Sequence, residues 1–137
     1  MKYDVILDAD KYVEIIRHTG TIRDYVELNL NDYDLSDGRI HAYKLGKNCL
    51  IWDQNRWDQI LADRQAAADQ AEIKDLKQKL NDSDYIIDRT FEDVMALNNP
   101  LTFITDIIKI MTDYRKKYAE MLLQRKAWRK RIEELGG

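Results

Sequence analysis

The C-terminal third of the chain carries a regular apolar stripe, which constrains the fold more than any other feature. Ten positions there follow alternating steps of three and four residues: Ile104, Ile107, Met111, Tyr114, Tyr118, Met121, Arg125, Trp128, Ile132 and Leu135. We call these ten positions the seam. The spacing is that of the a and d positions of a coiled coil, which face a partner helix. No Gly or Pro interrupts the stretch, so we expect one long helix that needs a partner in water.

Arg125 is the one residue of the seam that is neither apolar nor aromatic. A charge at a core position costs stability unless it is paired. Two interpretations stay open. Arg125 sets register or oligomeric state, as buried polar residues do in some coiled coils, or its side chain extends past Trp128 to solvent.

A second, weaker helical pattern begins near Asp53. Apolar residues recur every seven positions at Ala66, Ile73, Leu80, Ile87 and Val94. The positions between them are mixed: Asp69, Leu76, Ser83, Thr90 and Leu97. This pattern predicts a helix that offers a thinner apolar stripe than the seam.

Two polar segments punctuate this second pattern. Residues 81–84 predict either a break with a new N-cap or a polar patch in one helix; we favour continuity or a mild kink. Asn98-Asn99-Pro100 predicts a firm end, because the residue before a proline avoids the helical region. Two amphipathic helices joined by a short turn usually pack antiparallel, so we expect a hairpin.

Residues 1–53 have the composition of short strands and turns. Extended segments are predicted at residues 2–7, 12–17, 22–30, 40–45 and 49–52, with a loop at 31–38. The sequence therefore predicts an α+β protein with two parts. Residues 1–53 form a small antiparallel β-meander, and residues 54–137 form a helical hairpin or coiled coil. So small a sheet has a thin core and needs further packing.

Charge is distributed unevenly along the chain. Residues 54–100 hold six Lys/Arg and ten Asp/Glu, net −4, whereas residues 101–137 hold nine and five, net +4. An acidic helix followed by a basic one suits two helices that lie against each other, which we favour over a contact with another acidic molecule.

Candidate catalytic and metal-binding residues do not form a recognisable motif. His18 and His41 lack neighbours at zinc-ligand spacing. The acidic run Asp32, Asp34 and Asp37 lacks the Gly at position 6 and the Glu at position 12 of a calcium loop. Cys49, the single cysteine, has no activating motif beside it and is expected to pack in a strand. We expect a protein that is not an enzyme and that binds no cofactor and no metal.

Other classes are disfavoured by composition. The chain contains no apolar run of the roughly 18 residues that span a membrane, and its N-terminus is not a signal peptide, because Asp4, Asp8 and Asp10 interrupt it. Basic residues around Trp128 make a nucleic-acid face conceivable. The net charge of −3 argues against a dedicated nucleic-acid binder.

Two segments carry a family resemblance. They are Leu76-Lys77-Gln78-Lys79-Leu80-Asn81-Asp82-Ser83-Asp84-Tyr85 and Gln124-Arg125-Lys126-Ala127-Trp128-Arg129-Lys130-Arg131-Ile132-Glu133-Glu134-Leu135. They resemble the C-terminal region of small tail and tail-fibre-associated proteins of phages that infect Gram-positive bacteria. The segments Tyr43-Lys44-Leu45 and Leu50-Ile51-Trp52-Asp53 are similar to the front part of small phage tail proteins. Residues 86–123, with the Ile-rich stretch 104–110, depart from the pattern.

The resemblance implies a structural component of a phage tail tip or baseplate, made in the bacterial host cytoplasm and located in the virion. Its β part would dock and its helices would associate with other tail or baseplate proteins. One alternative is a tail or tail-fibre assembly chaperone that is absent from the mature virion. A second alternative is a nucleic-acid-binding phage regulator.

The seam helix also predicts self-association. Besides the seam it carries apolar residues on both flanks: Leu101, Phe103, Ile108, Ile110 and Leu122. The preceding helix cannot cover so wide a face, and uncovered apolar surface marks an interaction site. We therefore expect a homo-oligomer, with a trimer as the first guess because tail-tip organs are commonly threefold.

Overall fold

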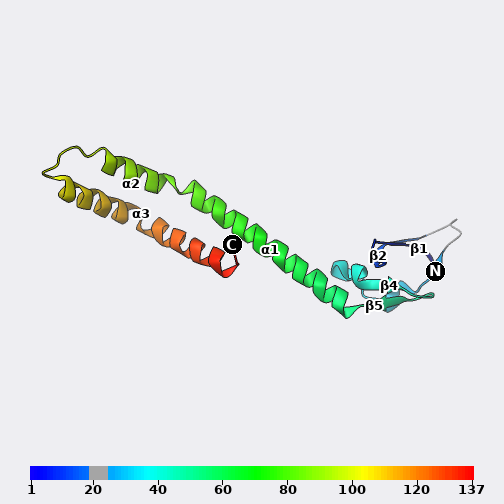
Figure 1. Ribbon diagram of the computed structural model, residues 1–137. Helices are drawn as coiled ribbons and strands as arrows, with labels where there is room; N and C mark the ends of the chain where they lie inside the picture. The colour runs from blue at the N-terminus through cyan, green and yellow to red at the C-terminus, as the bar shows by residue number, and fades with distance from the viewer. Residues whose placement is uncertain (19–24) are drawn as a thin grey trace. The chain divides into compact units, whose positions relative to one another are not determined.

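The structure is a computed structural model that describes residues 1–18 and 25–137 (Figure 1). Strands come first: β1 (Lys2–Leu7), β2 (Val13–His18), β3 (Val26–Glu27), β4 (Tyr43–Leu45) and β5 (Leu50–Trp52). Two 3₁₀ helices, η1 (Leu30–Asp32) and η2 (Ser36–Ala42), lie between β3 and β4. Three helices follow: α1 (Gln54–Asp82), α2 (Tyr85–Met95) and α3 (Phe103–Glu134). The predicted α+β class, with antiparallel strands before a helical hairpin, is confirmed.

The strands form two antiparallel sheets, one with the order β2-β1-β3 and one of β4 and β5. In a simple meander β2 would occupy the middle, whereas here β1 does. The turn between β1 and β2 is tight, because the Asp8 carboxylate accepts hydrogen bonds from the backbone N–H groups of Asp10 and Tyr12. This turn fixes β2 on one edge of β1, and β3 pairs with the other edge.

The segment between β3 and β4 is more ordered than the predicted loop. Asn29 caps η1 by accepting from the backbone N–H of Asn31. Asp37 and Gly38 both have positive φ, 52° and 79°, which lets the chain turn twice within η2. The strand predicted at 40–45 consequently begins only at Tyr43. Part of the extended segment predicted at 22–30 lies outside the described residues.

The chain divides into two compact units, Met1–Gln65 and Ala66–Gly137. The division falls within α1, whereas the sequence indicated a division where the helical period begins. The first unit has a core of five buried residues: Tyr3, Val13, Leu28, Tyr43 and Leu50. A core of this size is close to the minimum for a small sheet, so the polar contacts beside it matter.

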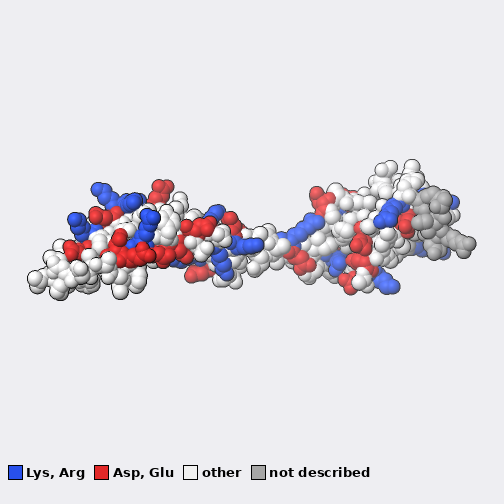
Figure 2. Space-filling view, turned by 90° about the horizontal axis from the view of Figure 1, so that it is seen from above, with Lys and Arg blue, Asp and Glu red and all other residues white. Residues whose placement is uncertain are grey.

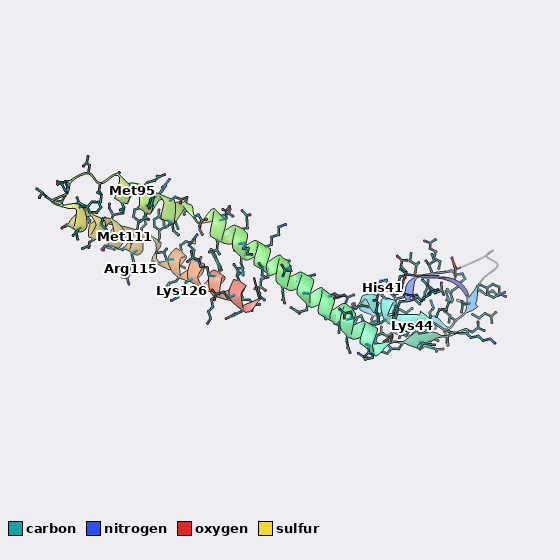
Figure 3. All side chains as sticks on the ribbon, in the orientation of Figure 1. His41, Lys44, Met95, Met111, Arg115 and Lys126 are labelled. Carbon is teal, nitrogen blue, oxygen red and sulfur yellow. The ribbon has the colours of Figure 1, made fainter. Side chains whose placement is uncertain are left out.

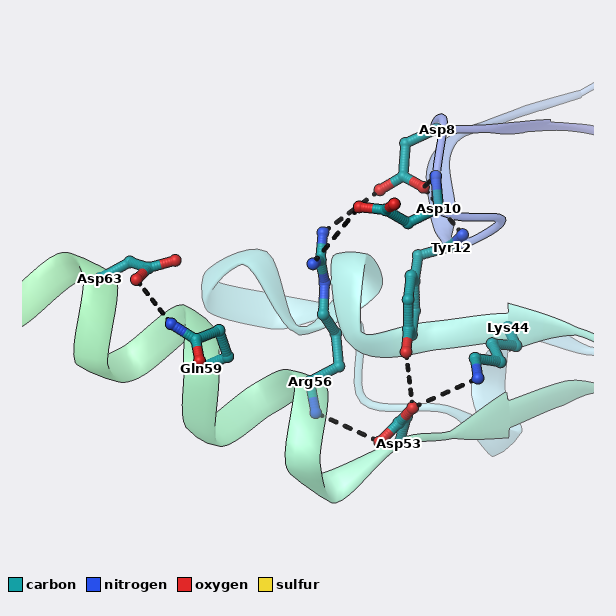
Figure 4. Close-up of polar contacts among 8 residues, drawn as sticks. All are labelled: Asp8, Asp10, Tyr12, Lys44, Asp53, Arg56, Gln59 and Asp63. Carbon is teal, nitrogen blue, oxygen red and sulfur yellow. Dashed lines mark hydrogen bonds and ion pairs between the residues drawn. The ribbon is translucent and has the colours of Figure 1, made fainter.

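A network of polar contacts joins the β1–β2 turn to the start of α1 (Figure 4). Asp53 is the N-cap of α1 and accepts from the backbone N–H of Arg56 at 3.2 Å and from the Tyr12 hydroxyl at 2.7 Å. The Arg56 guanidinium lies 4.6 Å from the centre of the Tyr12 ring and 3.4 Å from the Asp8 carboxylate. The first turn of α1 is thereby fixed to the hairpin of β1 and β2.

In the second unit, α3 runs antiparallel to α2 and to the C-terminal part of α1 (Figure 1). Three contacts define the register: Tyr114 with Asp93, Arg125 with Asp84, and Arg131 with Glu72. Each joins a residue of the basic segment or its seam to an acidic residue of the preceding segment. The acidic and basic halves therefore contact each other, as the charge distribution indicated. We call α2, α3 and residues 66–82 of α1 the hairpin.

Residues Ser83 and Asp84 separate α1 from α2, and we call them the junction. The backbone of Asp84 stays in the helical region (φ −64°, ψ −25°), and no side chain caps α2. The interruption is therefore a mild kink without a new N-cap. The turn is tightened, because the N–H of Asp84 bonds to the C=O of Asn81 and that of Ile86 to the C=O of Ser83, three residues back as in a 3₁₀ helix.

The tightened junction changes which face of α2 is buried. The seven-residue pattern predicted Ile87 on the packed side, and this was wrong. Ile86 is 2% exposed, whereas Ile87 is 45% exposed. The junction has about three residues per turn instead of 3.6, and this moves the buried position one residue towards the N-terminus, from Ile87 to Ile86.

The buried position of Ile86 can be tested by truncation. We expect Ile86→Ala to lower the free energy of unfolding by about 2–5 kcal/mol, because it leaves a cavity in a packed helix interface. Ile87→Ala, at the neighbouring exposed position, should cost about 0.5–1 kcal/mol. Urea unfolding followed by circular dichroism at 222 nm measures both. Equal losses in the two variants would contradict the register described above.

Asp53 predicts a pH dependence of stability. The hydrogen bond from the Tyr12 hydroxyl, followed by that from the Arg56 backbone, holds the pKa of Asp53 below its usual value. A carboxyl whose pKa is lower in the folded state stabilises fully above its unfolded pKa, about 3.9, and this stabilisation is lost as the pH falls through the folded pKa.

Melting temperatures measured between pH 6 and pH 2.5 test this effect. The wild type should lose more stability over that range than Asp53→Asn, which keeps an N-capping side chain but does not titrate. Measured in a Trp128→Phe background, tryptophan fluorescence reports on the first unit, because the two remaining tryptophans, Trp52 and Trp57, lie near Asp53 in sequence. Identical pH profiles for the two proteins would refute the role of the Asp53 charge.

Candidate interaction surface

The seam faces the inside of the hairpin over most of its length. Eight of its ten residues are buried or half-buried: Ile107, Tyr114, Tyr118, Met121, Arg125, Trp128, Ile132 and Leu135. Ile132 packs with Ile73 and Leu76 of α1. The backbone of α3 deviates from helical geometry at Tyr118 (φ −115°, ψ 17°), so the expected single helix is bent there. Ile104 and Met111, near the N-terminus of α3, are exposed.

Arg125 is the most deeply buried residue of the seam, with 3% of its surface exposed. Its guanidinium donates to the Leu80 carbonyl oxygen at 2.7 Å, to the Ser83 hydroxyl, and to the Asp84 carboxylate at 2.7 Å. All three acceptors belong to the end of α1 or to the junction. The interpretation in which Arg125 extends to solvent is therefore wrong.

The chemistry of the junction explains why an arginine stands there. In a continuous helix the C=O of Leu80 would accept from the N–H of Asp84, but that N–H bonds to Asn81 instead. Arg125 donates to the carbonyl that the kink leaves accessible, and its planar fork reaches the carboxylate of Asp84 at the same time. The Leu80 carbonyl also accepts from the N–H and the hydroxyl of Ser83, so Arg125 adds a charged donor to a group that already has partners. An apolar residue at this position could not make these bonds.

A groove lies between α2 and α3 towards the loop that joins them. It has a volume of about 760 Å³ and is mainly apolar, with these lining residues: Ile86, Ile87, Thr90, Phe91, Val94, Ile107, Ile108, Met111, Thr112, Tyr114, Arg115 and Leu122. Phe91 from α2 and Ile108 from α3 are 64% and 60% exposed. The groove is therefore open to solvent although its lining would be suited to a protein core.

Apolar exposure continues from the groove to the loop end of the hairpin. Leu101 is 94% exposed and Ile104 is 74% exposed. Figure 2 shows uncharged atoms gathered at this end of the hairpin, while charged side chains cover the part that follows. Met95 and Met111, labelled in Figure 3, add two more exposed apolar side chains from the facing helices. We call the groove and this end together the apolar surface.

The sequence located part of this surface and missed the rest. The flanking residues Leu101, Phe103, Ile108 and Leu122 are exposed as expected for an uncovered face, whereas Ile110 is half-buried. The contribution of α2 is not predicted, because the seven-residue pattern places Ile87 on the packed side and does not include Phe91. Their four-residue spacing, continued by Met95, is the signal that could have indicated a second apolar face.

The candidate catalytic and metal-binding residues are not brought together. Among the described residues, no group of three or more His, Cys, Asp or Glu could hold a metal ion. His18 packs edge-on against Tyr3, and His41 contacts the carbonyl of Val13 through Nδ1 at 3.2 Å. Hydrogen bonds from the Ser36 side chain and backbone keep the pKa of Asp34 below its usual value.

Basic residues near the C-terminus are partly paired within the chain. Arg131 forms two hydrogen bonds with Glu72, at 2.8 and 3.1 Å, and these raise its pKa. Arg125 is buried against the junction. Both arginines therefore make contacts within the hairpin. Fewer basic side chains remain for the nucleic-acid face that the sequence made conceivable. Within residues 1–18 and 25–137, none of the helices has both the length and the apolar character that a membrane span requires.

Comparison of the chain with protein-family models, curated protein sequences and solved structures finds no match. The apolar surface and the buried Arg125 are therefore interpreted from their own chemistry.

Arg125 can be tested by graded substitution. We expect Arg125→Ala to cost about 2–4 kcal/mol of stability, because it removes charge-assisted hydrogen bonds and leaves polar groups at the junction with fewer partners. Arg125→Lys should cost less, since an ammonium keeps the charge but not the planar fork. Arg129→Ala, at an exposed position of the same helix, serves as control and should change stability by about 0.5 kcal/mol or less. Urea unfolding measures all three, and an Arg125→Ala variant as stable as the control would refute the role assigned to the guanidinium.

Proposed function

We propose that the protein is a non-enzymatic structural subunit of a phage tail tip or baseplate, which associates with a neighbouring protein through its hairpin. The observation that carries the proposal is the apolar surface, where Phe91, Ile108 and Met111 line an open groove. Exposed apolar patches larger than a few hundred Å² are uncommon in monomeric proteins and mark interaction sites. The resemblance of residues 76–85 and 124–135 to small tail proteins supplies the setting.

The distribution of stabilising contacts supports a role in association. Arg125 and the Ile73–Leu76–Ile132 cluster stabilise the end of the hairpin away from the loop. The loop end has no comparable buried cluster among the described residues, and its apolar side chains face outward. A stable helical pair that presents uncovered apolar side chains at one end is suited to insertion against another protein.

The first unit offers a second place for docking. Ile51 and Trp52 of β5 are 52% and 36% exposed, and within residues 1–18 and 25–137 β5 pairs with β4 on one side and with no strand on the other. An unpaired strand edge beside apolar side chains is a common site of contact between proteins. This is consistent with docking through the β unit, while the hairpin makes the other contact.

Mass spectrometry of particles purified from the phage that encodes the chain tests the proposal. Peptides of the chain should copurify with tail proteins through a density gradient, in several copies per particle. If the chain is abundant in the infected-cell lysate but absent from particles, the proposal of a virion subunit fails and the assembly-chaperone alternative is supported. At about 150 mM salt, non-specific binding of proteins to DNA is weak. Retention of the chain on a DNA column at this salt concentration would instead support the regulator alternative.

A further inference from the structure

The apolar surface has charged residues of opposite sign on its two sides. In α2, Asp88 lies three residues before Phe91 and so beside the groove on the outer side of α2, and Glu92 lies one turn after Asp88, further from the groove. In α3, Lys109 and Lys116 lie three before and four after Thr112, which lines the groove. The groove therefore has an acidic α2 side and a basic α3 side.

The net charges of α2 and of the first half of α3 agree with this division. Residues 85–95 hold one arginine and three acidic residues, net −2, and residues 103–118 hold four basic and two acidic residues, net +2. Asp88, Glu92, Lys109 and Lys116 are all exposed. Within the described part of the chain, no ion pair is recorded for any of these four residues. A partner surface with the opposite arrangement would complement both sides.

We infer that the occupant of the groove is a second copy of the hairpin, packed face to face across a two-fold axis that runs along the hairpin. This inference rests on the proposed function in one respect: both concern the apolar surface, and the inference names the partner that binds there. Rotation about such an axis places α2 of each copy over α3 of the other. The acidic side of each groove then meets the basic side of its partner, as an isologous interface requires.

The register of the hairpin specifies which residues meet. Since the Tyr114 hydroxyl reaches Asp93 at 2.7 Å, and α2 and α3 are antiparallel, Lys116 lies at about the level of Phe91. In the two-fold pair Lys116 of one copy therefore lies within about one helical turn of Asp88 of the other along the axis. The alternative axis, perpendicular to the hairpin, would set α2 over α2 and bring acidic residues together.

Helix direction favours the same arrangement. With the axis along the hairpin, α2 of one copy runs antiparallel to α3 of the other, so the four helices form a bundle in which neighbouring helices are antiparallel. This is the geometry of up-and-down helix bundles, and neighbouring helix dipoles oppose each other favourably. Phe91, Ile108 and Met111 of both copies supply its core. The arrangement is two-fold and so differs from the threefold assembly expected from the resemblance.

Sedimentation velocity of the full chain between about 0.5 and 50 µM tests the inference. The wild type should sediment as a dimer at the upper concentrations. Ile108→Asp should raise the dissociation constant at least tenfold, because it places a carboxylate in the apolar contact. Leu123→Asp is the matched control, since Leu123 is 70% exposed on α3 and does not line the groove. It should dissociate as the wild type does.

A charge exchange tests the orientation. Asp88→Lys and Lys116→Asp should each raise the dissociation constant about three- to tenfold, since each replaces an attraction with a repulsion at both ends of a two-fold interface. The double variant should recover most of the loss. Circular dichroism of every variant verifies that the hairpin is folded.

Several results would overturn the inference: a wild-type monomer or trimer, a control that dissociates like Ile108→Asp, or a double variant weaker than both single ones. These outcomes are independent of the particle experiment. A dimeric chain that is absent from particles would refute the proposed function and leave the inference standing, whereas a monomeric chain found in particles would do the reverse.

Discussion

The hairpin depends on one interaction, the insertion of the Arg125 guanidinium into the junction of α1 and α2. A charged group that is 3% exposed is costly to bury unless its donors are satisfied; both terminal nitrogens of Arg125 find acceptors, whereas its Nε has none among the described residues. The junction supplies a carbonyl, a hydroxyl and a carboxylate at one place, because the helix is kinked there. The kink and the arginine therefore require each other. Together they determine how α3 is aligned along α1 and α2.

The alignment carries consequences along the whole hairpin. With Arg125 against Leu80 and Ser83, the next turns of α3 bring Trp128 and Ile132 onto Ile73 and Leu76. In the other direction they bring Tyr114 to Asp93, whose carboxylate raises the pKa of the Tyr114 hydroxyl by accepting its hydrogen bond. Apolar packing thus predominates at one end of the hairpin, and polar contacts with an open groove at the other. An apolar residue at position 125 would pack without making one of the three polar contacts that define this register.

Periodicity in the sequence was sufficient to predict the hairpin. The three- and four-residue steps of the seam identified α3 and most of its packed side, and Asn98-Asn99-Pro100 lies in the loop between Met95 and Phe103 where the chain reverses. Predictions from the period of apolar residues were wrong where the backbone departs from regular helix or strand geometry. The tightened junction moved burial from Ile87 to Ile86, and the turn at Asp37 and Gly38 replaced the start of a predicted strand. The pairing of β3 with β1 joins residues that are distant in sequence, and such a pairing cannot be predicted from local composition.

The apolar surface was only half predictable for the same reason. The wide apolar face of α3 follows from its own residues, but the part played by Phe91 depends on the rotation of α2, which only the junction determines. The proposals of a tail subunit and of a two-fold hairpin pair both use this surface. Each can fail without the other, because one concerns where the chain is found and the other concerns what fills the groove.

The junction also makes the number of residues before α2 a determinant of what α2 displays. Successive residues of an α-helix are rotated by about 100° around its axis. Inserting one residue at Ser83-Asp84 would turn Phe91 away from the groove and carry Arg89 towards it, and deleting one residue would carry Asp88 towards it, with no change in the composition of the rest of either helix. The number of residues at the junction therefore determines which side chains of α2 line the groove, just as the identity of those side chains does. Substitutions at the junction change the stability of the hairpin, whereas insertions and deletions there change the residues that α2 presents to a partner.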